Sequence, residues 1–104
     1  MASPYNPPVS GEDFIFYATL NSMATPGSFQ SNPTIAAGDF KVSTDGGALA
    51  NLTTIPAVTP ASSVMVKFTV SAGEMTGGNV TIIGIDQTTP KEWADFSVNV
   101  VTTA

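Results

Sequence analysis

The alternation of apolar and polar residues between positions 64 and 100 is the feature that most constrains the fold of this chain. Three runs in this stretch, VMVKFTV, NVTIIGID and EWADFSVNV, are separated by a glycine pair and by a short loop that contains proline. Within the first run the valines and Phe68 share one face, and Met65, Lys67 and Thr69 share the other. A period of two residues is typical of a half-buried strand. Three such strands in succession need a second sheet to cover their apolar face.

The other runs of this stretch refine that expectation. Ser71 and Glu74 match a capping box, which predicts a single helical turn at the corner after the first run, with Met75 dropping into the core. The run NVTIIGID is apolar on both faces, which predicts a central strand that is covered on each side or lies at an interface. The last run is expected to alternate as well. Its predicted inward residues are Ala94, Phe96, Val98 and Val100, and its predicted outward residues are Trp93, Asp95, Ser97 and Asn99.

Strand patterns also occur in the first half of the chain. DFIFYATL is expected to direct Phe14, Phe16, Ala18 and Leu20 inward, and GDFKVS to direct Phe40 and Val42 inward with Asp39, Lys41 and Ser43 outward. Asp45-Gly46-Gly47 offers the positive φ angles that a tight hairpin needs. Residues 21–34 are crowded with turn formers, which predicts a long loop with a short edge strand near Phe29. Pro56 and Pro60 bracket a predicted crossover between sheets.

These patterns predict an all-β protein. The expected architecture is a two-sheet antiparallel β-sandwich with six to seven strands, immunoglobulin-like in strand number but without the Cys and buried-Trp signature of antibody domains. A jelly roll or a small barrel is the alternative. Residues 12–104 form the predicted single domain. Residues 1–11, which hold Pro4, Pro7 and Pro8, are expected to form an extended arm that would lie on a neighbour in an assembly. The alternative is a terminus that is disordered in the isolated protein.

Composition excludes several classes of function. The net charge is −5, and the chain contains no histidine and no cysteine. Nucleic acid binding needs a basic stripe, which is missing here. Disulfides, zinc-thiolate sites and histidine-based acid–base catalysis are excluded in the same way. Asp86 and Asp95 are expected to face each other across the last hairpin, where capping of turns is favoured over metal binding. We therefore expect no enzymatic activity, no metal and no cofactor.

Three aromatic residues are the candidates for contact with a ligand or a partner. Trp93, predicted to face outward beside Asp95, could stack on a sugar ring or anchor a protein interface. The alternative is that Trp93 covers the end of the sandwich. Tyr17 and Tyr5 are the other two candidates. Protein contact is favoured over sugar binding, because sugar sites usually pair aromatic side chains with several polar ones and no such cluster is evident.

Residues 38–95 resemble a small β-sandwich module of tailed-bacteriophage virion proteins, where it occurs alone or fused within tail-tip and fibre proteins. The phrases that carry the resemblance are GDFKVSTDGGALANLTTIPAVTP, VKFTVSAGEM and EWADFSVNV with Asp86. The most specific pieces are Val42-Ser43 with Asp45-Gly46-Gly47, and Ser71 with Glu74-Met75. These residues belong to turns and corners, so the resemblance assigns no active or binding site.

The resemblance implies an accessory virion structural protein. The first residues, MASPYNPPVSGED, lack the basic and apolar regions of a secretory signal, so synthesis in the host cytoplasm without a signal peptide is expected. The expected location of the protein is around the tail or the head-to-tail region, where it would act as an adaptor or adhesin. The expected partners are tail, portal-adaptor or capsid proteins and copies of the chain itself, without nucleic acid and without membrane insertion. A capsid decoration protein that cements shell subunits is one alternative. A binding module for host-surface glycans, with Trp93 as its platform, is another.

Overall fold

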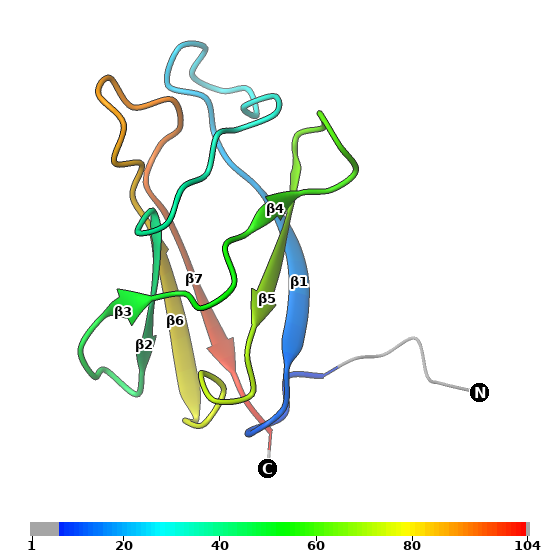
Figure 1. The fold of residues 1–104 in the computed structure, drawn as a ribbon, viewed down its shortest axis with the longest axis vertical. Coiled ribbons are helices and arrows are strands. Elements are labelled where there is room, and N and C mark those ends of the chain that lie inside the picture. The colour runs from blue at the N-terminus through cyan, green and yellow to red at the C-terminus, as the bar shows by residue number, and fades with distance from the viewer. Residues whose placement is uncertain (1–6, 104) are drawn as a thin grey trace.

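The computed structural model describes residues 7–103, whose strands form two antiparallel sheets packed face to face (Figure 1). The order of the first sheet is β1-β5-β4, and the order of the second is β3-β2-β6-β7. No helix occurs in this range, so none there could cross a membrane. The prediction of an all-β sandwich with six to seven strands is confirmed. The strands are β1 (Phe14–Thr19), β2 (Phe40–Thr44), β3 (Ala50–Asn51), β4 (Ala57–Val58), β5 (Met65–Val70), β6 (Asn79–Gly84) and β7 (Phe96–Val101).

The strand order is that of an immunoglobulin-like domain. Such domains place strands B, E and D in one sheet and strands C, F and G in the other, with C′ added beside C in variable-type domains. The order β1-β5-β4 corresponds to B-E-D, and β3-β2-β6-β7 corresponds to C′-C-F-G. The chain changes sheet after β1, β3 and β5 and forms hairpins between β2 and β3, β4 and β5, and β6 and β7. The chain crosses from one sheet to the other between β3 and β4, at residues 52–56. The predicted crossover between Pro56 and Pro60 was therefore placed too late, because that segment already contains β4.

Six aromatic rings fill the space between the sheets. Phe68 of β5 is fully buried and stacks on Phe16 of the neighbouring strand at 4.8 Å between ring centroids. It meets Phe40 of the opposite sheet edge-on at 5.0 Å and stacks on Phe96 at 5.5 Å. Offset and edge-to-face pairs contribute about 0.5 to 1.5 kcal/mol each beyond their buried area. The inward residues predicted for β1 and β5 therefore form the core, as their alternation indicated.

Two local turns match the sequence expectation. Asp45 and Gly46 have φ angles of 50° and 79°, and the amide of Gly47 donates to the carbonyl of Thr44 at 2.9 Å, which closes the predicted hairpin. The Ser71 amide donates to the Glu74 carboxylate at 2.9 Å, and the Met75 amide donates to the Ser71 carbonyl at 3.0 Å. Met75 is fully buried. The corner is thus a single hydrogen-bonded turn, although no helix forms there.

Two residues predicted to face outward in the run GDFKVS are buried instead, namely Asp39 just before β2 and Ser43 within it. Asp39 is 3% exposed because its carboxylate accepts hydrogen bonds from the amides of Ala36 and Gln87. Ser43 is 8% exposed because its hydroxyl donates to the carbonyl of Gly47. Both side chains are covered by the loops next to the strand. The alternation of residues along a strand cannot predict burial by such loops.

The described end of the predicted arm lies against the sandwich. Val9 forms a parallel bridge with Thr103, and the Gly11 amide donates to the carbonyl of Met75 at 2.8 Å. Residues 8–11 are therefore hydrogen-bonded to the domain itself rather than extended away from it. The rest of the predicted arm, residues 1–6, lies outside the described residues.

Gly84 of β6 provides a test of the aromatic packing. It lies opposite Phe40 on one side and Phe96 on the other, and a Cβ atom at this position would lie 2.4 Å from the ring of Phe40. Phe40 cannot move aside, because its ring is packed against Phe68, Phe96 and Trp93. We expect Gly84→Ala to lower the free energy of unfolding by about 1 to 3 kcal/mol, measured by urea denaturation.

Gly73→Ala is the matched control. Gly73 is exposed, and an added Cβ would meet no atom within 4 Å. We expect this substitution to change the free energy of unfolding by less than about 0.5 kcal/mol. Equal effects of the two substitutions would contradict the proposed ring contact at Gly84.

Candidate functional site

Three loops gather at the end of the sandwich opposite Val9 and Thr103 (Figure 1). They are residues 20–39 between β1 and β2, residues 59–64 between β4 and β5, and residues 86–95 of the connection between β6 and β7. We call these three segments together the loop end. In immunoglobulin variable domains, loops at one end of the sandwich form the binding surface. The loop end is therefore the candidate binding surface of this domain.

Backbone hydrogen bonds join the first and last of these loops into one unit. The Met23 amide donates to the carbonyl of Glu92 at 3.0 Å, and the Ala94 amide donates to the carbonyl of Asn21 at 2.9 Å. On the side away from residues 92–94, residues 20–22 pair with residues 28–30 through an isolated bridge between Asn21 and Phe29. The edge pairing predicted near Phe29 is thus present as a single bridge. Because the two loops share one ladder, they form a structured surface rather than independent flaps.

Trp93 lies in the core beneath this ladder, and the prediction that it faces outward is wrong. Its side chain is fully buried, its ring stacks on Phe40 at 5.1 Å, and its indole N–H donates to the carbonyl of Thr34 at 3.2 Å. The alternation failed because β7 begins only at Phe96, and Trp93 belongs to the preceding loop. Trp93 closes the end of the sandwich. It offers no ring face to a sugar, so the glycan-binding alternative loses its predicted platform.

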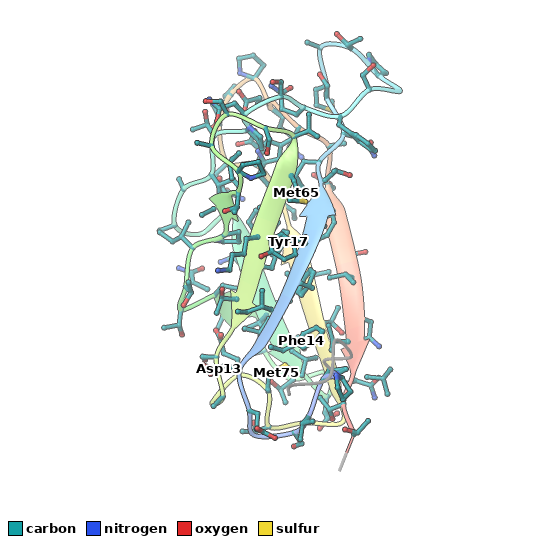
Figure 2. All side chains as sticks on the ribbon, turned by 90° about the vertical axis from the view of Figure 1, so that its right-hand side faces the viewer. Asp13, Phe14, Tyr17, Met65 and Met75 are labelled. Carbon is teal, nitrogen blue, oxygen red and sulfur yellow. The ribbon has the colours of Figure 1, made fainter. Side chains whose placement is uncertain are left out.

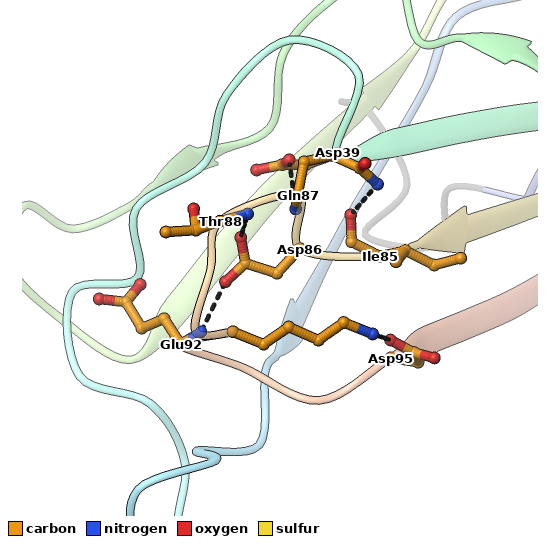
Figure 3. Close-up of polar contacts among 8 residues, drawn as sticks. Asp39, Ile85, Asp86, Gln87, Thr88, Glu92 and Asp95 are labelled. Atoms are coloured by element: carbon orange, nitrogen blue, oxygen red, sulfur yellow. Dashed lines mark hydrogen bonds and ion pairs between the residues drawn. The ribbon is translucent and has the colours of Figure 1, made fainter.

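Two buried carboxylates hold the turns of the loop end (Figure 3). Asp86 accepts hydrogen bonds from the amide of Thr88 at 2.9 Å and from the amide of Glu92 at 2.7 Å. Asp39 accepts from the amide of Gln87 at 3.2 Å and so links β2 to the same loop. Within the described residues, every buried polar side-chain atom has a hydrogen-bond partner. The loop end therefore has the fully satisfied polar network that a rigid surface requires.

Asp86 and Asp95 have separate partners. Asp86 caps a turn, as expected, whereas Asp95 accepts a hydrogen bond from Lys91 at 2.9 Å on the surface. Burial alone raises the pKa of Asp86, but the hydrogen bonds from the backbone amides of Thr88, Glu92 and Trp93 outweigh this effect. The result is a pKa below the ordinary value of 3.8, because these donors favour the charged form. Asp86 is thus a structural anion at neutral pH.

The outer surface of the loop end exposes two large apolar side chains. Met23 is 48% exposed and Phe29 is 56% exposed. Met23 also lines an open hollow of about 360 Å³ together with Lys91, Ala94 and Asp95. Sequence reasoning missed both residues. The signal that could have found them was a large apolar residue at two positions of a loop made otherwise of turn formers.

A second hollow lies on the outer face of the four-stranded sheet. Its volume is about 150 Å³. Leu49 and Ile85, which are 51% and 40% exposed, contribute apolar surface to it, and Lys41 contributes a charge. Farther along this face Thr81 donates to Asn99, and Asn99 donates to Asn79. The residues that line this hollow are Gly38, Asp39, Lys41, Leu49, Ile83, Ile85 and Gln87.

The structure does not bring the three predicted contact residues together. Trp93 is buried, and Tyr5 lies outside the described residues. Tyr17 is 51% exposed on the outer face of β1, opposite Lys67 of β5 (Figure 2). Of the three, only Tyr17 is thus a described, exposed side chain, and it lies away from the loop end.

The acidic side chains around the loop end accept hydrogen bonds from groups of the chain itself. The described residues contain no group of three His, Cys, Asp or Glu side chains that could hold a metal ion. Asp39 and Asp86 are both occupied by backbone amides, and Asp95 by Lys91. Comparison of the chain with protein-family models, with curated proteins and with solved structures finds no match.

The pKa of Asp86 gives a test of the network in the loop end. A carboxylate whose folded pKa is lowered stabilises the fold above its unfolded pKa, and this contribution is lost as the pH falls through the folded value. We expect Asp86→Asn to lower the free energy of unfolding at pH 7 by about 1 to 3 kcal/mol, because the amide group turns an NH₂ toward a backbone donor. Below a pH of about 4 the difference from the wild type should shrink. Urea denaturation at several pH values, followed by Trp93 fluorescence, measures both effects.

Asp95→Asn is the control for this experiment. The Asp95 side chain is 62% exposed and forms only a surface ion pair with Lys91. Such pairs contribute little, so we expect a change below about 0.5 kcal/mol at every pH. A difference between Asp86→Asn and the wild type that stays constant down to acidic pH would contradict the assigned role of the charge.

Proposed function

We propose that this protein is a non-enzymatic structural protein of a bacteriophage particle, located around the tail or the head-to-tail region, and that it acts as an adaptor or adhesin. In this proposal the loop end binds a protein partner. The observation that carries it is the joining of two loops into one hydrogen-bonded unit that exposes Met23 and Phe29. The resemblance of residues 38–95 to virion modules supports the setting.

Preorganisation supports binding at the loop end. A long free loop loses conformational entropy when it binds, which weakens the complex. The ladder between residues 21–23 and 92–94 and the carboxylate caps of Asp39 and Asp86 have already ordered these loops in the free protein. Burial of Met23 and Phe29 would therefore contribute to affinity with little further ordering. Methionine and phenylalanine are also enriched at protein interfaces.

The charge pattern favours an apolar partner surface. Residues 21–38 contain no charged side chain, and the nearby Lys91 and Asp95 neutralise each other. A partner surface that covers residues 21–38 would desolvate few charged groups, and the nearby Glu92 carboxylate accepts a hydrogen bond from the amide of Thr34. We therefore expect the contact to depend weakly on salt concentration, unlike an interface built on complementary charges.

The positions of the loop end and of the chain terminus at opposite ends of the sandwich support an adaptor or adhesin role. The loop end lies at one extremity of the sandwich, and the described C-terminal end of the chain lies at the other (Figure 1). There Thr103 is hydrogen-bonded to Pro8 and Ser10. Contacts at the two extremities would face away from each other. A domain of this kind can be held at one end while the other end binds, as an adaptor or an adhesin must.

The test uses paired serine substitutions in phage particles produced with the variant protein. We expect the double variant Met23→Ser, Phe29→Ser to bind its virion partner, or the host surface, at least about tenfold more weakly, because two apolar anchors are lost. The matched control is Leu49→Ser, Ile85→Ser on the outer face of the four-stranded sheet, which removes two apolar side chains of similar exposure. Quantitative mass spectrometry of purified particles and adsorption to host cells measure the outcome.

Three results would overturn parts of the proposal. Absence of the protein from purified particles would overturn the virion assignment. Wild-type incorporation and adsorption of the folded loop-end variant would overturn the role of the loop end. A label on the protein that appears over the whole shell in many copies, rather than at the tail, would replace the proposed location with capsid decoration.

A further inference from the structure

The edge of β1 differs from the other sheet edges of the sandwich. Four strands lie at edges, and two of them, β3 and β4, are only two residues long. Near β7, the segment that holds Val9 pairs with Thr103, and the outward side chains of β7 include the polar Ser97 and Asn99. β1 has six residues and, within the described part of the chain, pairs only with β5. It is thus a long strand with one open side.

The sequence of β1 lacks the devices that usually protect an edge. Its residues, FIFYAT, include no charge, no proline and no glycine. Natural proteins commonly place lysine, proline or a bulge on exposed edge strands to prevent pairing with another chain. In an antiparallel pair, alternate residues direct their N–H and C=O groups away from the partner strand. About half of the backbone groups of β1 are therefore directed away from β5, on the side where the described residues supply no strand.

The side chains of β1 are suited to a second copy of the same strand. Ile15 and Tyr17 are 40% and 51% exposed on the outer face, and Phe16, which packs against the core, is only half-buried. Figure 2 shows Tyr17 on this strand. Antiparallel pairing about a two-fold axis at Phe16 places Ile15 of each copy opposite Tyr17 of the other copy, so the same pair forms twice. Aromatic side chains paired with β-branched ones across strands are stabilising. The same register keeps both apolar faces on the core side.

Charge does not oppose this pairing. The protein carries a net charge of −5, so two copies repel each other in general. β1 itself is neutral, and Lys67, the charged residue opposite Tyr17, lies on β5, one strand away from the edge. The strand thus offers a neutral, self-complementary contact on an acidic molecule.

We propose that two copies of this chain associate through β1, with the two strands antiparallel and the two-fold axis at Phe16. The two three-stranded sheets then form one continuous six-stranded sheet, in which both β1 edges are paired. This association goes beyond the proposed function and does not depend on it, because the contact lies away from the loop end. A purified protein without any phage component is enough to test it.

The first test introduces lysine on the outer face of the edge. We expect the double variant Ile15→Lys, Tyr17→Lys to dissociate at least about tenfold more readily than the wild type, since the charges replace apolar cross-strand contacts. The matched control, Ile83→Lys, Ile85→Lys, makes two changes to lysine on the outer face of the opposite sheet. Sedimentation velocity over a range of concentrations gives the dissociation constants, and thermal unfolding shows whether each variant is folded.

A wild-type protein that is monomeric at all accessible concentrations would overturn the inference. A dimer that persists in the folded β1 variant, or that is lost only in the control, would also overturn it. If dimerisation fails while loop-end variants still lose incorporation, the proposed function stands and only the β1 contact is wrong.

The second test determines the register. Because the native chain has no cysteine, single cysteine variants give unambiguous disulfide crosslinks. Under mild oxidation, a mixture of Ile15→Cys and Tyr17→Cys should form the mixed dimer in preference to either homodimer. A crosslink of Tyr17→Cys only with itself would overturn the axis at Phe16, because that product requires an axis at Tyr17.

Discussion

The packing of Phe68 between the two sheets is the interaction on which the rest of the structure depends. Phe68 is fully buried and touches rings from three other strands, namely Phe16, Phe40 and Phe96. Antibody domains join their two sheets by a disulfide between strands B and F. This chain has no cysteine, and aromatic contacts occupy the same space between the sheets. Because ring contacts are short-ranged and require close packing, the sandwich tolerates little added volume at its centre.

The same aromatic packing extends to the loop end. Phe40 contacts Phe68 on one side and stacks on Trp93 on the other, so the core continues into the loop between β6 and β7. Asp39 and Asp86 then bind the backbone amides of that loop. A buried carboxylate is stable here only because several N–H groups satisfy it. The conformation of the loop end is therefore determined by buried contacts, and its exposed side chains are available for contact with a partner.

The two proposed contacts of this protein rely on different physical features. The loop end offers exposed Met23 and Phe29 on a surface whose two main loops are hydrogen-bonded to each other. The β1 edge offers the reverse, since its backbone groups on one side lack a partner in the described chain. Apolar side chains accept many partners of suitable shape, whereas an open strand edge selects another strand. One domain can thus combine self-association with attachment to a different protein.

The sequence by itself determined the features that depend on neighbours along the chain. Alternation identified β1, β5 and β7, the Asp45-Gly46 pair identified the hairpin, and the corner at Ser71 followed from its spacing to Glu74. The fold class could be predicted because these signals act within one strand or turn.

Only the tertiary structure decided which side chains are covered from outside their own strand. Trp93 was predicted to face outward, but alternation holds only within a ladder and β7 begins at Phe96. Asp39 is buried by amides that include that of Gln87, 48 residues away in the sequence. The candidate surface at Met23 and Phe29 likewise exists only because residues 21–23 pair with residues 92–94. Contacts between distant segments leave no periodic signal in the sequence, and these contacts shape the site.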